Sequence, residues 1–170
     1  MSLVSPEWAR MMARYNAWQN GSIYGAADGL TDEARREDRG AFFGSIHATL
    51  SHLLWGDTMW MSRFDGWDRP EVGMSGSASW IEGWDDLRSR REAADARIAS
   101  WADGLGEGDL QGELTWYSGV LGRETGAPKA RTLVHFFNHQ THHRGQVHAM
   151  LTAAGATPGD TDLFLMPQES

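Results

Sequence analysis

Residues 133–151 read LVHFFNHQTHHRGQVHAML, and they hold five of the seven histidines in the chain. Apolar residues recur here at steps of three and four, which is the period of an α-helix with one buried face. On such a helix His135, His139 and His143 form a stripe that borders the apolar face instead of lying opposite it. The stretch therefore predicts a long amphipathic helix that places imidazoles beside the protein core.

Three more helices are predicted on the N-terminal side of this one. They span about Pro6 to Asp28, Phe42 to Phe64 and Ser79 to Leu105, and the histidine-bearing helix runs from about Pro128 to Gly155. Ser5 followed by Pro6 is a start signal for the first helix, because serine caps helix N-termini and proline is tolerated in the first turn. The third helix is expected to begin at a capping box, Ser79-Trp80-Ile81-Glu82.

The segments between the helices differ in character. Residues 31–39 are charged and predict a loop with one helical turn, whereas the Gly- and Ser-rich residues 66–77, with Pro70, predict a loop. Residues 110–125 hold Ser118-Gly119 between two apolar groups, of which the second is Val120-Leu121, and predict a short hairpin or an extended loop. The apolar residues 163–166 near the C-terminus are expected to pack back onto the body.

Four helices of this length favour an all-α fold, namely a four-helix bundle with a long loop or short hairpin between its third and fourth helices. The chain has 170 residues, of which 41% are hydrophobic and a further 20 are glycine. This is enough for one folded domain with a core of its own. Since no repeat or linker divides the sequence, residues 1–170 are expected to form a single domain.

The composition excludes several classes of protein. The chain has no cysteine, which rules out disulfides, cysteine-based zinc sites and thiol nucleophiles. Its net charge of −8 opposes binding to nucleic acid or to an anionic membrane. No apolar run is long enough to span a bilayer and the first residues resemble no signal or transit peptide, so a cytoplasmic location is expected.

Two histidines four residues apart on a helix can bind one metal ion, because both imidazoles face the same side one turn apart. His135 and His143 lie too far apart along the axis to join His139 at a single ion, so at most one neighbouring pair of the three can bind it. The second helix offers His47 and His52 as a third ligand, and periodicity does not choose between them. Histidines that border a core are also found simply hydrogen bonded, without any metal.

Several patterns of catalytic residues are absent from the sequence. The run HQTHH has Gln140 where a zinc protease requires a glutamate, and no Glu-x-x-His is present for a di-iron site. No glycine-rich phosphate-binding motif occurs, and the serines near His47 and His52 lack the context of a catalytic triad. These reaction classes are therefore not expected.

One charged residue, Asp57, interrupts the apolar stripe of the second helix. A buried carboxylate is costly unless it is paired, so a cationic partner is expected. If the second and fourth helices run parallel, as alternate helices of an up-and-down bundle do, Arg144 can reach Asp57 across the core. The alternative is that Asp57 faces a hydrated cleft while Arg144 extends to solvent.

Three groups of residues form a recognisable set. They are Tyr15-Asn16 with Trp18 and Asn20; His52-Leu53-Leu54-Trp55-Gly56-Asp57 with Trp60 and Arg63-Phe64; and residues 138–146, NHQTHHRGQ. These groups resemble the sequence signatures of the DinB family, within the DinB/YfiT-like superfamily of proposed metalloenzymes. The third group is the most specific, since it matches the family's motif NHxxHHRGQ, and the resemblance covers about residues 8–166.

The resemblance implies a four-helix bundle with one divalent ion, zinc or nickel, held by His52, His139 and His143. Three histidine ligands leave one coordination position open, as in catalytic zinc sites. Characterised relatives in the superfamily imply a metal-dependent enzyme, a thiol S-transferase or a hydrolase, that acts on a small molecule with a low-molecular-weight thiol. The resemblance also implies a homodimer, and it does not imply binding to nucleic acid, which the acidic charge and the absence of a basic stripe oppose.

The residues that would assist the reaction are less well defined. His142 and Gln146 lie on the same helix face as the expected ligands, and Asn16 and Asn20 are candidates from the first helix. The alternative function is a non-catalytic metal-binding stress-response protein, whose ion mainly stabilises the fold. A fourth ligand from the protein would favour this alternative, and a position open to water or a small molecule would favour the enzyme.

Overall fold

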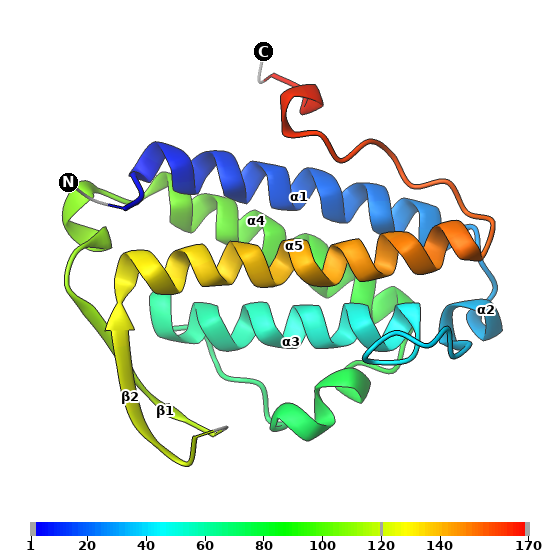
Figure 1. Ribbon diagram of the computed structural model, residues 1–170, viewed down its shortest axis with the longest axis horizontal. Coiled ribbons are helices and arrows are strands. Elements are labelled where there is room, and N and C mark those ends of the chain that lie inside the picture. Colours follow the sequence, from blue (N-terminus) through cyan, green and yellow to red (C-terminus); the bar gives the residue numbers. More distant parts are fainter. Residues whose placement is uncertain (1–2, 120, 169–170) are drawn as a thin grey trace.

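The computed structural model describes residues 3–119 and 121–168, and within them four long helices pack along one another (Figure 1). The long helices are α1 (Pro6–Asp28), α3 (Ile46–Phe64), α4 (Trp84–Asp103) and α5 (Lys129–Ala153). The short elements are α2 (Asp32–Arg36), the 3-10 helices η1 (Met74–Ser79), η2 (Glu107–Leu110) and η3 (Leu163–Leu165), and the strands β1 (Glu113–Ser118) and β2 (Arg123–Pro128).

The bounds of α1 agree with the local signals in the sequence. The Ser5 hydroxyl accepts a hydrogen bond from the backbone N–H of Trp8 at 3.2 Å, Pro6 occupies the first turn, and Gly29 caps the C-terminus. α2 is the single helical turn expected within residues 31–39.

The prediction that the second long helix begins at Phe42 is wrong, since α3 begins at Ile46. Gly44 has a φ of 78°, a conformation that ends any helical path before it. Ser45 then caps α3, and its side chain accepts from the backbone N–H of Ala48 at 3.1 Å. Phe42 and Phe43 therefore belong to the loop that leads into α3.

The start predicted for the third long helix is also wrong. α4 begins at Trp84, with Gly83 as its N-cap, and Ser79 is the last residue of η1. The residues in between are held against α3 instead of continuing into a helix: the carbonyl of Ile81 lies 2.8 Å from His47 Nε2. A tertiary contact thus overrides a local capping signal.

The four long helices form a ring of neighbours, in which α1 and α3 each pack against both α4 and α5. α3 and α5 run antiparallel, because His52 contacts His143 whereas Trp60, eight residues later, contacts His135, eight residues earlier. The prediction that these two helices run parallel is therefore wrong. α3 and α4 are the pair of successive long helices that run in the same direction (Figure 1).

The segment 65–83 explains this direction, because it returns along α3 before α4 begins. Trp55 donates from Nε1 to the carbonyl of Val72 at 2.9 Å, and Ser51, one turn earlier on α3, donates from its hydroxyl to the carbonyl of Ser77 at 3.0 Å. The loop therefore reaches the N-terminal end of α3, and α4 starts there.

The prediction of a purely all-α chain needs correction, since residues 113–128 form a small antiparallel sheet. β1 pairs with β2 in a register that joins Glu113 to Pro128 and Ser118 to Arg123. A short hairpin between the last two long helices was one of the two expected alternatives, and it is the one observed. Val120, which was expected to follow its turn, lies outside the described residues.

The interior of the helical body holds a charged cluster in addition to its apolar core. Asp57 on α3 is 0% exposed and accepts from Arg91 on α4 at 2.6 Å. Arg91 also lies 2.8 Å from Asp95, whose carboxylate accepts from the side-chain amides of Asn16 and Asn20 on α1. These contacts tie three of the long helices together at one level.

The prediction that Asp57 pairs with Arg144 is wrong, and so is the alternative that both reach water. Arg144 is buried and donates to the side-chain oxygen of Asn16, so α5 joins the charged cluster through α1. The antiparallel direction of α3 and α5 is the physical reason, because the predicted pairing assumed parallel helices. Arg91 was overlooked as a partner, although it is a charged residue within the apolar repeat of α4.

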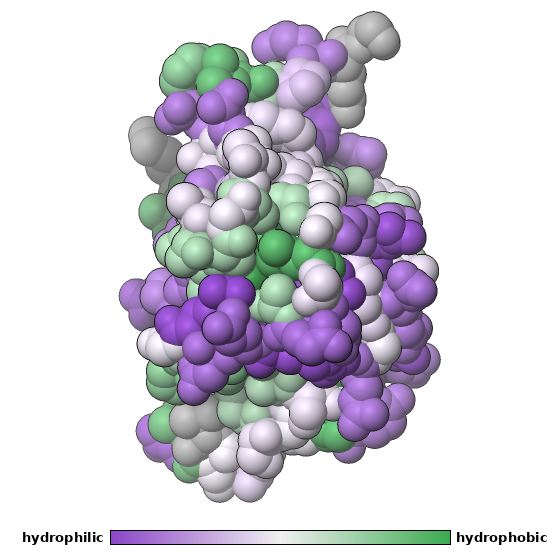
Figure 2. Space-filling model, turned by 90° about the vertical axis from the view of Figure 1, so that its right-hand side faces the viewer, coloured by the Kyte–Doolittle hydropathy of each residue, from purple (hydrophilic) through white to green (hydrophobic). Residues whose placement is uncertain are grey.

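The C-terminal tail returns to α1, but its apolar residues Leu163, Phe164 and Leu165 are exposed instead of packed onto the body. The backbone carbonyl of Thr161 accepts from the hydroxyl of Tyr15, and that of Asp160 accepts from the side chain of Gln19. Phe164 is 83% exposed, and the hydrophobic group at the top of Figure 2 marks this part of the surface. In the described ranges, no helix has both the length and the apolar character to cross a membrane.

Asp57→Ala is expected to destabilise the metal-free protein by about 3–5 kcal/mol, because it leaves Arg91 buried without its closest partner. Asp86→Ala is the matched control, since Asp86 pairs with Arg90 on the half-exposed face of α4 and should cost less than about 1 kcal/mol. Urea denaturation measures both. Equal losses in the two variants would contradict a structural role for the buried pair.

Candidate metal centre

Three histidines from two helices meet near the middle of the α3–α5 interface. His52 comes from α3, and His139 and His143 come from successive turns of α5. Each offers a ring nitrogen, and these nitrogens all lie within 4.8 Å of one another. His52 and His143 are buried and His139 is half-buried. Two residues four apart on α5 thus face a single residue on the antiparallel helix, which gives three converging donors.

His52 is oriented by the loop that follows α3. Its Nδ1 lies 2.8 Å from the hydroxyl of Ser77, and this hydroxyl in turn donates to the carbonyl of Met74 at 2.7 Å. Since the Ser77 proton is used in that second bond, the hydroxyl oxygen accepts from the His52 ring. The proton of neutral His52 then sits on Nδ1, and the lone pair of Nε2 is left to bind a metal ion.

His143 is oriented within its own helix. Its Nδ1 lies 2.8 Å from Oε1 of Gln146, one turn later on α5. An amide oxygen can only accept, so Nδ1 of His143 carries the proton and Nε2 is again left with a lone pair. Gln146 is therefore placed as a positioning residue for His143.

His139 lies against the backbone of α3 at Gly56. A Cβ atom at residue 56 would lie 2.8 Å from Cε1 of His139, so only glycine allows this approach. The Nδ1 atom of His139 is buried and has no hydrogen-bond partner in the described residues. Leaving a buried nitrogen without a hydrogen-bond partner costs free energy. An imidazole in this setting can bind a metal ion through one of its ring nitrogens.

The electrostatic setting keeps the three imidazoles neutral. Burial, with a smaller contribution from His143, lowers the pKa of His52 to about 4. Burial and the neighbouring histidines lower the pKa of His139 to about 3. The pKa of His143 is also lowered by burial, although its hydrogen bond with Gln146 opposes the shift. Neutral imidazole is the form that binds metal ions, so the cluster needs no deprotonation near neutral pH.

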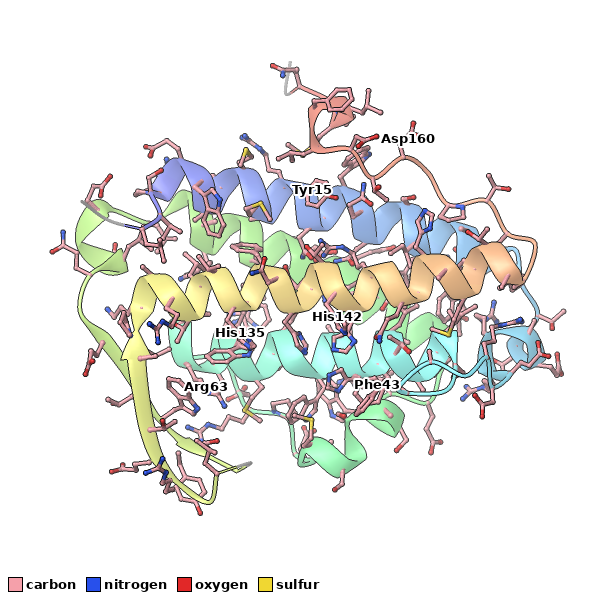
Figure 3. The ribbon with its side chains drawn as sticks, in the orientation of Figure 1. Tyr15, Phe43, Arg63, His135, His142 and Asp160 are labelled. Atoms are coloured by element: carbon pink, nitrogen blue, oxygen red, sulfur yellow. The ribbon has the colours of Figure 1, made fainter. Side chains whose placement is uncertain are left out.

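Aromatic and imidazole rings border the cluster on the outside. Phe43 stacks on His52 with ring centroids 3.9 Å apart, and it also contacts His143 at 5.5 Å. The exposed His142 lies edge-on to His143 at 4.9 Å (Figure 3). The outer side of the cluster is therefore flanked by the ring of Phe43, which lies on His52, and by the imidazole of His142, which lies beside His143.

The structure directs three other candidate residues, His47, Asn16 and Asn20, away from the three histidines. The side chain of His47 turns to the carbonyl of Ile81, so His52, not His47, is the histidine of α3 that meets the pair on α5. Asn16 and Asn20 are buried between α1 and α4, where both donate to Asp95. In the described part of the chain, neither asparagine forms a hydrogen bond with one of the three histidines.

Three residues that shape the cluster were not anticipated. Ser77 lies in the loop 65–83, and nothing in its local sequence points to His52. Phe43 was placed within a helix, although it lies in the loop before α3. Gly56 carried a usable signal, because a glycine inside a helix costs about 1 kcal/mol relative to alanine and often marks a close approach.

This combination of four long helices and a buried three-histidine cluster defines a class of helical proteins with the donor set of a metal site. The sequence model of the DinB family matches residues 5–169, and the chain therefore belongs to the DinB family. The chain is also 27% identical over 166 residues to the protein named Protein DinB of Bacillus subtilis (strain 168). The match covers 94% of this chain and 93% of that relative.

The metal-free protein is expected to lose stability as the pH falls. Histidines in an unfolded chain have a pKa of about 6.5, whereas the fold lowers the pKa of His52 to about 4 and that of His139 to about 3. Between these values the unfolded state binds more protons, so the free energy of unfolding decreases as the pH is lowered from about 6.5 towards 4. Urea denaturation across this range measures the decrease.

His139→Gln isolates the contribution of the cluster to this pH dependence. The variant removes one group that titrates only on unfolding, so its free energy of unfolding should fall less steeply with decreasing pH. An identical pH dependence in both proteins would show that other groups control it.

Proposed function

We propose that this chain is a metal-dependent DinB-family enzyme with the architecture of a four-helix bundle, in which His52, His139 and His143 hold one divalent ion. The observation that carries this proposal is the set of three neutral, largely buried imidazoles, of which His139 is half-buried, whose nitrogens converge within 4.8 Å. All-imidazole sites suit zinc and nickel, and either ion fits the proposal.

The hydrogen bonds around the cluster support a metal site more than a structural cluster of histidines. His52 and His143 each donate one ring N–H to a neighbouring oxygen, which turns the other nitrogen towards the shared centre. Metal-bound histidines typically have such a second partner, because it fixes both the tautomer and the ring orientation. His139 adds a buried nitrogen without a hydrogen bond.

The proposed chemistry is the transfer of a thiol or the hydrolysis of a small molecule. A divalent ion with three imidazole ligands and an open position supplies Lewis-acid activation of a thiol or a water. Within the chain, Gln146 and Ser77 hold two ligands in place. His142 is exposed beside His143 and is the group best placed to accept or return a proton.

The alternative is a non-catalytic metal-binding stress-response protein, and one observation favours it. Phe43 covers His52 and contacts His143, so an aromatic ring shields part of the cluster from solvent. A thiol titration of the cobalt-loaded protein distinguishes the two functions, since a thiolate that binds cobalt gives a charge-transfer band. This band is expected for the enzyme, and its absence would favour the alternative.

The ligand assignment is tested by the metal content of variants purified without chelator. Alanine in place of His52, His139 or His143 should abolish stoichiometric metal, because two imidazoles remain and the open site loses its third donor. His47→Ala is the control, since its side chain bonds to Ile81 and should leave the metal content unchanged. Loss of metal in His47→Ala with retention in His52→Ala would refute the assignment.

Gly56→Ala is expected to weaken metal binding without unfolding the protein. The new methyl group would displace the ring of His139 from α3, while alanine itself favours the helix over glycine. We expect a metal affinity at least about tenfold lower, as for other disturbed ligand positions. Competition with a chromophoric chelator measures this affinity.

Gly145→Ala is the matched control for Gly56→Ala. Gly145 also lies within a long helix and only two residues after His143, but a Cβ atom there would meet nothing within 4 Å. Its metal affinity should equal that of the unaltered protein. Equal affinities in both variants would show that the close approach at Gly56 does not position His139.

A further inference from the structure

A second group of residues lies along the same interface, towards the C-terminal end of α3, and it has no role in the proposed metal site. It consists of Trp60 and Arg63 on α3, His135 on α5 and Trp116 on β1, and we call it the tryptophan–arginine group. The ring of Trp60 lies 5.0 Å from His135 and 5.4 Å from Trp116. Figure 3 shows Arg63 and His135 on neighbouring helices of one face.

The guanidinium of Arg63 is held by aromatic faces and not by an anion. Its Cζ atom lies 4.4 Å from the centroid of Trp60 and 5.3 Å from that of Trp116. Within residues 3–119 and 121–168, no carboxylate forms an ion pair with it and no acceptor receives a hydrogen bond from it. A guanidinium that contacts only aromatic rings keeps its N–H donors without oxygen acceptors, so these donors remain available to a ligand.

The surroundings of Arg63 are positive and partly desolvated. Burial, together with the neighbouring Arg69, lowers the pKa of Arg63 to about 10. Burial and the charge of Arg63 also lower the pKa of His135, which keeps that imidazole neutral and able to hydrogen bond. A half-buried cation without a counter-ion is a place where an anionic ligand is favoured.

The tryptophan–arginine group is connected to the metal centre through α5. His135 lies one turn before His139, and the two ring centroids are 5.9 Å apart. Arg63 lies seven residues after Gly56, where His139 touches α3, so the guanidinium is on the order of 10 Å from the level of the cluster along the helix axis. This separation matches the length of a small molecule of extended shape.

We propose that Arg63, packed against the rings of Trp60 and Trp116, binds a carboxylate of the same molecule whose other end reaches the three-histidine centre. This inference rests on the proposed function and narrows its substrate class to small molecules with a carboxylate about two helical turns away from the metal-binding group. His135 lies between the two ends and contributes a neutral hydrogen-bonding group. The hairpin β1–β2 also belongs to this proposed carboxylate site, because it brings Trp116 over Arg63.

The experiment uses cobalt-loaded protein and two pairs of thiol probes. The long pair is 8-mercaptooctanoate and 8-mercaptooctanol, and the short pair is 3-mercaptopropionate and 3-mercaptopropanol. The charge-transfer band reports binding of each thiol to cobalt, and the ratio of the two dissociation constants within a pair reports the preference for the carboxylate. The short carboxylate cannot reach Arg63 while its thiol is bound to the metal.

We expect the preference for the carboxylate to be about tenfold greater in the long pair than in the short pair, which is the strength of a charge-assisted hydrogen bond at a partly exposed site. Arg63→Met should remove this difference. Arg97→Met is the matched control, because Arg97 on α4 lies 3.9 Å from the ring centroid of Trp67 in the loop after α3 and should leave the difference intact.

Every other outcome would overturn the proposal. Equal ratios for the long and short pairs in the unaltered protein would overturn the carboxylate site, and this arm requires no variant to fold. A difference that survives in Arg63→Met, or a variant that only lowers the unfolding temperature, would show that Arg63 merely holds the hairpin against α3. Failure to bind cobalt, or binding of cobalt without any thiol band, would overturn the proposed thiol chemistry and the inference with it.

Discussion

The contact of the His139 imidazole with the α3 backbone at Gly56 sets the spacing of the two helices that carry the candidate ligands. Any side chain at residue 56 would place a Cβ atom 2.8 Å from the ring. A wider spacing would move His52 away from His143, and the three ring nitrogens would no longer converge. The absence of a side chain at one position of α3 is thus the condition for the cluster as a whole.

The buried charged cluster also constrains the positions of α3 and α5. Asp57 follows Gly56 and pairs with Arg91, while Arg144 follows His143 and bonds to Asn16. Buried ion pairs are weak sources of net stability, because desolvation offsets the attraction. Their geometric demand is strong, however, since a shift of either helix by one turn would leave a buried charge without a partner. We therefore regard this network as a device that fixes the register of α3 and α5.

Local signals in the sequence predicted some elements well and failed where distant contacts decide. The start and end of α1 follow from Ser5, Pro6 and Gly29, which act within one turn of the helix. The direction of α4 depends instead on the path of residues 65–83, which is set by contacts such as that of Trp55 with Val72. Such contacts join residues that no local pattern links, so the parallel arrangement of α3 and α5 was wrongly predicted.

In the candidate site, too, local sequence patterns predicted some features and failed to predict those that depend on distant contacts. Spacing on α5 predicted that His139 and His143 share a face, but it left His47 and His52 as equal choices for α3. The resemblance to the DinB family favoured His52, and the structure brings His52 to the pair on α5. Ser77, Phe43 and Arg91 could not be assigned to their partners, because each meets residues from another element of the fold.

The three histidines come from two helices that are distant in the chain, and the chain has no cysteine. An ion held by His52 on one side and by His139 and His143 on the other would therefore be a reversible crosslink in a protein that has no covalent one. Its contribution to stability would follow mass action, growing with the logarithm of the free metal concentration above the dissociation constant. The folded lifetime of this protein in a cell would then depend on how much metal the cell supplies.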